Sequence, residues 1–100
     1  MTISKAVAEY IASKENVLSP STIEGYRNVE RNRLSEIADI EIADFDTITA
    51  QKYINEMARR LSAKSVANAW GLVAAAVKQQ APEKVLTVTL PSKKKRAREL

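Results

Sequence analysis

The chain has 100 residues, a length that supports one domain with a small core. It contains no cysteine and no histidine, which excludes disulfides, thiolate metal sites and a conventional catalytic triad. No apolar run approaches the roughly 18 residues of a transmembrane helix. The N-terminal segment is also not a signal peptide, because Lys5 and Glu9 interrupt its apolar residues. We therefore expect an intracellular, cytoplasmic protein with no metal and no cofactor.

The net charge of +4 comes entirely from the C-terminal end. Residues 1–92 carry eleven basic and eleven acidic side chains, whereas residues 93–100 carry five basic side chains against the single acid Glu99. A basic run beside a neutral body attracts polyanions, of which nucleic acid is the usual one. A tail that is only solvated is the alternative, and charge alone does not decide between the two.

Scarce glycine and proline, together with apolar residues at helical spacing, predict an all-α fold. The first predicted helix covers residues 2–14, with Thr2 as its N-cap. The second begins after the capping Ser19 with Pro20 in its first position, and it should end near Ala38.

An acidic connector over residues 39–48 leads to two further predicted helices. Thr49 is expected to cap the third, over residues 50–60, and Ser62 the fourth, over residues 63–80. The fourth is apolar on nearly all sides, which is typical of the central helix of a bundle. Residues 85–90 fit a strand or an extended connector equally well. The chain thus divides into a helical domain, 1–84, and an extended linker with a basic tail, 85–100.

Catalysis finds little support in the sequence. Carboxylate pairs such as Asp44 and Asp46 can act as general acids and bases only when a cleft desolvates them, and in a polar connector they are expected to be solvated. The two glycines, Gly25 and Gly71, are isolated and form no phosphate-binding loop. An enzyme fragment with a hidden carboxylate site is therefore the weakest hypothesis.

Nucleic-acid binding finds more support in the starts of the second and fourth helices. Unpaired amides and the helix dipole favour phosphate at a helix N-terminus. Lys64, Ser65 and Asn68 are residue types that contact phosphates and base edges, and Arg27 and Arg31 share one face of the second helix. We expect the two capped starts to lie side by side on one positive surface, although each residue taken alone is better explained as an ordinary cap or a solvated side chain.

Three segments, in order, resemble the core-binding domain of tyrosine recombinases, the phage integrase family. Residues 18–27 are similar to its S-x-x-T-x-x-x-Y pattern, through Ser19, Thr22 and Tyr26. Residues 46–54 are similar to the start of its third helix, I-T-x-x-x-apolar. Residues 61–68 are similar to its L-S-x-K-T-apolar-x-N pattern, with Ser65 in place of the common threonine, and residues 90–98 resemble its basic linker.

The resemblance implies a four-helix, SAM-like orthogonal bundle with an extended basic C-terminal tail. Such a domain clamps duplex DNA at a recombination site, without catalysis of its own, during DNA integration in a bacterial host cell. The implied partners are duplex DNA, other recombinase protomers, and a catalytic domain of the same full-length protein that would begin after residue 98. The implied DNA-binding residues are Ser21, Thr22, Arg27, Arg31, Lys64, Ser65, Asn68, Lys93, Lys94, Lys95 and Arg96.

A helical protein-interaction module that docks a partner helix is the alternative function. A contiguous exposed apolar patch around Leu72 and Ala76 would favour it.

Overall fold

The computed structural model describes residues 1–91, so the predictions made for Lys93, Lys94, Lys95 and Arg96 lie outside the described residues. Four α-helices follow one another: α1 (Ile3–Lys14), α2 (Pro20–Asn32), α3 (Thr47–Ala58) and α4 (Ala63–Gln80), with a single 3-10 turn, η1 (Ile42–Asp44), before α3. Within residues 1–91 the only β-type pairing is an isolated bridge between Thr2 and Glu41. The predicted all-α bundle is confirmed.

Side-chain caps fix the helix starts, and three of the four were predicted correctly. The hydroxyls of Thr2, Ser19 and Ser62 accept hydrogen bonds from backbone amides of the first turns of α1, α2 and α4, at 3.2–3.3 Å. The prediction for α3 is wrong. Its cap is Asp46, whose carboxylate accepts a hydrogen bond from the Thr49 amide at 2.8 Å. This bond lowers the pKa of Asp46 and starts α3 three residues before the predicted position.

The predicted end of α2 near Ala38 is also wrong, because the helix stops at Asn32. The chain then turns, and backbone carbonyl groups after the turn accept hydrogen bonds from amides at the start of α1. The amide of Ile3 donates to the Ile40 carbonyl at 2.8 Å, and the amide of Ser4 donates to the Ala38 carbonyl at 3.1 Å. These bonds satisfy amides that a helix N-terminus leaves without partners, and a continued α2 would remove the acceptors.

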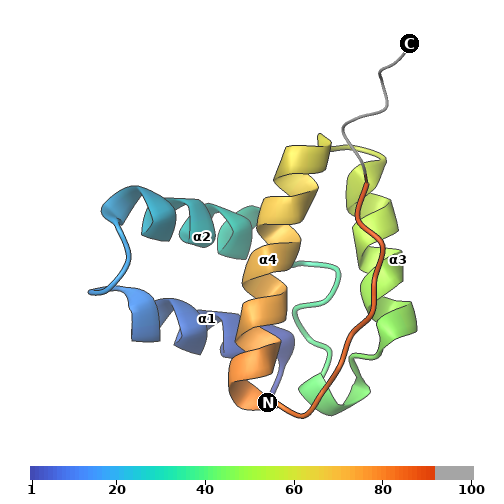
Figure 1. Ribbon diagram of the computed structural model, residues 1–100, viewed down its shortest axis with the longest axis horizontal. Coiled ribbons are helices and arrows are strands. Elements are labelled where there is room, and N and C mark those ends of the chain that lie inside the picture. Colours follow the sequence, from blue (N-terminus) through green and yellow to red (C-terminus); the bar gives the residue numbers. More distant parts are fainter. Residues whose placement is uncertain (92–100) are drawn as a thin grey trace.

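α4 lies at the centre of the bundle, as predicted, with α1 and α2 on one side and α3 on the other (Figure 1). Its buried residues face every neighbouring helix. Leu72 and Ala76, around which an exposed patch was considered, are 1% and 0% exposed, so that patch does not exist. The buried face of α4 comprises Val66, Ala69, Trp70, Leu72, Val73, Ala76 and Val77.

Residues 85–91, here called the strap, run in extended form along α3 (Figure 1). Of the two alternatives left open by the sequence, the extended connector is the observed one. The side-chain amide of Gln51 binds the strap at two points: its Oε1 accepts from the Thr89 amide at 2.8 Å, and its Nε2 donates to the Thr89 carbonyl at 3.0 Å. The amide of Thr87 donates to the Thr47 hydroxyl at 3.4 Å. The strap therefore leaves the domain along a defined path.

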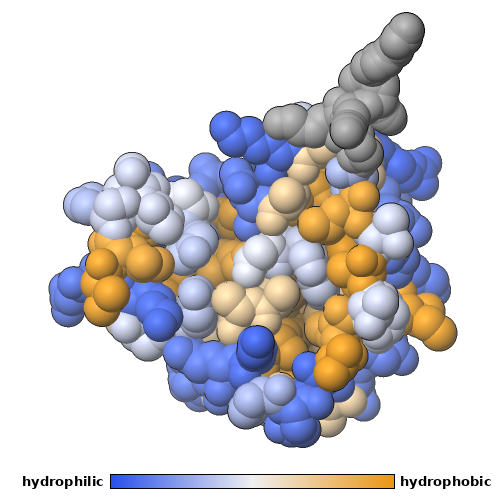
Figure 2. All heavy atoms as spheres, in the orientation of Figure 1, coloured by the Kyte–Doolittle hydropathy of each residue, from blue (hydrophilic) through white to orange (hydrophobic). Residues whose placement is uncertain are grey.

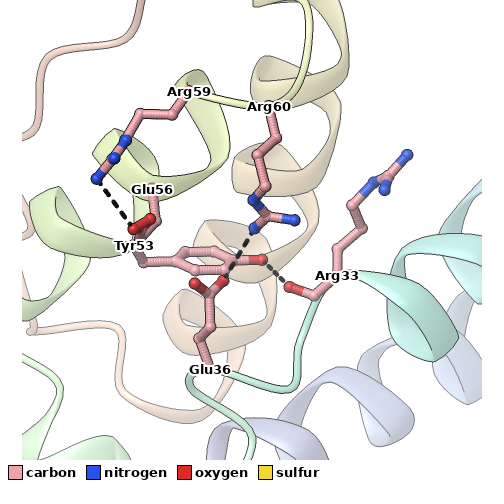
Figure 3. A network of polar contacts seen from close by, with 6 residues as sticks. All are labelled: Arg33, Glu36, Tyr53, Glu56, Arg59 and Arg60. Carbon is pink, nitrogen blue, oxygen red and sulfur yellow. Dashed lines mark hydrogen bonds and ion pairs between the residues drawn. The ribbon is translucent and has the colours of Figure 1, made fainter.

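Tyr53 connects α3 to the turn that follows α2 (Figure 3). Its ring is 3% exposed, and its hydroxyl donates to the Arg33 carbonyl at 2.7 Å. Two ion pairs lie nearby at the surface, Arg60 with Glu36 at 3.6 Å and Arg59 with Glu56 at 3.4 Å. Because exposed ion pairs contribute little, the hydrogen bond of the buried phenol is the stronger polar contact between α3 and the turn after α2.

The Tyr53 phenol predicts a loss of stability at alkaline pH. Burial raises its pKa above the value of about 10 that applies in the unfolded chain. Above that pH the folded state retains a proton that the unfolded state loses, so the free energy of unfolding falls as pH rises, by at most about 1.4 kcal/mol per pH unit. Urea unfolding between about pH 9 and pH 11 measures this slope. Tyr53→Phe should be less stable at neutral pH by about 1 kcal/mol and should show a shallower alkaline slope; equal slopes would contradict the assignment.

The Gln51 contacts predict that this side chain holds the strap in place. In Gln51→Ala the Thr89 amide loses its acceptor, so its hydrogen exchange, followed residue by residue by NMR, should become several-fold faster. Asn55→Ala is the matched control, because Asn55 accepts a hydrogen bond from Gln51 but makes none to the strap. Unchanged exchange at Thr89 in Gln51→Ala would show that other contacts hold the strap.

Candidate functional site

An open groove of about 770 Å³ lies between α2 and α4. Hydroxyl, amide and guanidinium side chains share its walls with the two glycines of the chain. The lining residues from α2 and the turn after it are Ser21, Thr22, Glu24, Gly25, Tyr26, Asn28, Val29 and Arg33, and those from α4 are Ser65, Ala67, Asn68, Gly71 and Leu72.

Four of the predicted site residues line this groove: Ser21, Thr22, Ser65 and Asn68. The two pairs come from opposite walls, since one belongs to α2 and the other to α4. The Thr22 hydroxyl lies 2.9 Å from the Ser19 hydroxyl, and the Ser62 hydroxyl donates to that of Ser65 at 3.2 Å. Capping thus fixes the position of two groove hydroxyls that stay accessible from the solvent side.

The other predicted cations of the helical body do not line the groove. Arg27 is paired with Glu15 at 3.0 Å and with Glu30 at 3.7 Å, which directs its guanidinium toward carboxylates. Arg31 and Lys64 are exposed, and neither has an ion-pair partner among residues 1–91. Lys64 lies next to the groove in sequence, because it precedes Ser65 in the first turn of α4.

Arg33 lines the groove and was missed by the sequence analysis. Within residues 1–91 its side chain has no ion-pair partner, in contrast to Arg27. A helical stripe was the available signal: Thr22, Gly25 and Val29 recur at spacings of three and four, and Arg33 continues that stripe by four residues. The predicted arginines, Arg27 and Arg31, lie on the adjacent face of α2 and do not line the groove.

The starts of α2 and α4 do not lie side by side as expected. α2 begins at the outer edge of the molecule and ends against α4, which begins at the top of the view in Figure 1. The common surface is instead the corner that the two helices enclose, and the groove extends along both of them. Side chains from the first turns reach that surface, but the helix ends themselves are apart.

The acidic connector stays away from this surface. None of the acidic residues between Glu36 and Asp46 lines the groove, and Glu24 is the one carboxylate that does. Tyr26, at the groove wall, packs against Tyr10 with ring centroids 6.1 Å apart. Burial and the neighbouring Tyr10 raise the pKa of Tyr26, so its phenol is a neutral hydrogen-bonding group at neutral pH.

Apolar side chains reach the surface in two places. In Figure 2, pale and blue atoms cover much of α2, tan and blue atoms cover the upper part of α4, and orange patches lie along the strap and beside α1 and α2. The exposed large apolar side chains include Val17 at 77%, Ile48 at 70% and Val85 at 78% exposure. Within residues 1–91, no group of three or more potential metal ligands occurs, and no helix has both the length and the apolarity to cross a bilayer.

A surface of hydroxyls, amides and one unpaired guanidinium is suited to phosphate and sugar oxygens. It offers neutral donors that adapt to an oxygen-rich ligand, and its single carboxylate limits repulsion of an anion. The arrangement supports binding, and it contains no nucleophile paired with a base.

One comparison with known proteins gives a match. A family model described as phage integrase, N-terminal SAM-like domain, matches residues 2–58, which is more than half of the chain and includes α1, α2 and α3. No curated protein and no solved structure matches the chain.

Proposed function

Because the chain belongs to the family of the phage integrase N-terminal SAM-like domain, we propose that it binds duplex DNA through the groove between α2 and α4. The matched domain is non-catalytic and has an integrase-type DNA-binding role in general. The observation that carries the proposal is the groove itself, in which Ser21 and Thr22 of one helix face the same open space as Ser65 and Asn68 of another. These are neutral hydrogen-bonding side chains of the types that proteins use on DNA.

The cations of the site have different roles in this proposal. Arg33 contacts a phosphate inside the groove, and Lys64 and Arg31 contact phosphates at its edges. Arg27 contributes only if DNA displaces Glu15 and Glu30. Since residues 1–92 have no net charge, the helical body alone binds weakly, and the basic run Lys93, Lys94, Lys95 and Arg96 supplies most of the electrostatic attraction by following the DNA backbone.

The partners follow from the same proposal. A catalytic domain of the same full-length protein follows the basic run and cuts and rejoins the DNA, and the strap sets the direction in which the chain approaches it. Other protomers bind neighbouring sites on the same DNA. The setting is the cytoplasm of a bacterial host cell, where the chain takes part in DNA integration.

The alternative function, docking of a partner helix, has lost the feature expected for it. Leu72 and Ala76 are buried in the core, so α4 presents no free apolar face there. The proposal of DNA binding therefore stands as the one that the groove supports.

DNA binding by the 100-residue chain should depend strongly on salt. Each neutralised phosphate lowers the logarithm of the association constant by about 0.9 per tenfold increase in salt, so about four contacts predict a loss of roughly a hundredfold between 50 mM and 200 mM salt. Fluorescence anisotropy with a labelled duplex measures this directly. No binding at low salt, or an affinity that salt leaves unchanged, would refute the proposal.

Single-charge variants separate groove contacts from general attraction. Arg33→Ala and Lys64→Ala should each weaken binding and reduce the salt slope by about one unit. Arg59→Ala and Lys78→Ala are matched controls that remove the same charge elsewhere, and Lys78 lies about 21 Å along α4 from Lys64 at about 1.5 Å per residue. Equal losses in variants and controls would mean that the groove is not the binding surface. Circular dichroism checks that all four remain folded.

A further inference from the structure

The two glycines of the chain both lie inside helices and both line the groove. Gly25 is the sixth residue of α2, and Gly71 is the ninth residue of α4. Both are exposed, and they stand on opposite walls of the same open space. No other glycine occurs in the sequence.

Neither position needs glycine for the fold. A glycine inside a helix is less favourable than alanine by about 1 kcal/mol, because it loses more backbone freedom on folding. A Cβ atom added at Gly25 or at Gly71 would meet no atom within 4 Å, so helix packing does not require the missing side chain. Both residues have ordinary helical backbone conformations, so no turn or left-handed φ requires it either.

Glycine is the less favourable residue at both positions, and helix packing explains neither glycine. Because the two lie on facing walls of one groove, they indicate that a ligand, and not the fold, requires glycine there. A bare helix backbone lets a ligand approach closer than any side chain would allow. The surrounding donors suit an oxygen-rich, anionic ligand, and the family supplies its class.

We infer that Gly25 and Gly71 hold the groove open for close approach of a sugar–phosphate strand of duplex DNA to the backbones of α2 and α4. This inference rests on the proposed function and adds the two contact positions. With the backbone of the DNA against the glycines, the short side chains of Ser21, Ser65 and Asn68 reach phosphate and sugar oxygens from both walls. A methyl group at either position moves the strand outward and breaks these short contacts on its own wall.

Gly25→Ala, Gly71→Ala and the double variant test this inference in the 100-residue chain. Each single substitution should raise the melting temperature by about 4–8 °C, since the added side chain meets open space and favours the helix. Each should also weaken duplex binding by about tenfold in the anisotropy titration, and the double variant by more. Opposite effects on stability and binding are the signature of a position kept for its ligand.

Two controls complete the test. Asn55→Ala also introduces alanine at an exposed helix position, but on α3 and outside the groove. It should leave the affinity for DNA unchanged, because a change in the stability of the helix does not by itself change DNA binding. Ala75→Gly introduces a glycine into α4 outside the groove, and it should reduce stability while leaving the affinity for DNA unchanged.

The outcomes distinguish the inference from the function on which it rests. If the wild-type chain binds DNA and the glycine variants bind equally well, the inference is wrong and the proposed function stands. If a glycine variant is less stable than the wild type or does not fold, its glycine serves the fold and the inference is overturned. If the wild-type chain binds no duplex at low salt, both fail together.

Discussion

Burial of one broad face of α4 is the constraint from which the rest of the domain follows, because the opposite face, with Lys64, Asn68 and Gly71, is exposed. A broad apolar helix face is stable only when neighbouring helices cover it, and α1 and α3 cover that of α4 from two sides. α2 covers less of it and meets it near its own C-terminal end (Figure 1). The corner left between α2 and α4 is the groove, so the site exists because one helix is covered unevenly.

The local chemistry of the sequence was sufficient to find the helix starts, and it failed where distant residues decide. Ser19 and Ser62 cap helices because hydroxyl and amide lie three residues apart, a relation visible in the sequence. The end of α2 depends instead on Tyr53 and on amides at the start of α1, which no local pattern contains. Asp46 and Thr49 were both able to cap α3, and the carboxylate, the stronger acceptor, prevails.

The candidate site was predictable to a similar degree. The sequence patterns of the second and fourth helices identified four lining residues, of which Ser21, Thr22 and Ser65 lie in the first turn of their helix. The sequence patterns did not show that α2 and α4 begin at different ends of the molecule. Nor did they show that Arg27 forms an ion pair with Glu15, while Arg33 has no ion-pair partner within residues 1–91. Those facts depend on the angle between helices, which is set by core packing and not by the motifs.

Charge and shape therefore act in different parts of the chain. The helical body has equal numbers of acids and bases, so its own field gives little attraction for a polyanion, whereas residues 93–100 carry a net charge of +4. A surface without net charge discriminates among ligands by shape, because the closeness of the ligand decides which hydroxyl and amide side chains can reach it. Gly25 and Gly71 leave the backbones of α2 and α4 uncovered on facing walls of the groove. Such positions suit this surface, because short-range contacts with a ligand matter most where long-range electrostatic attraction is weak.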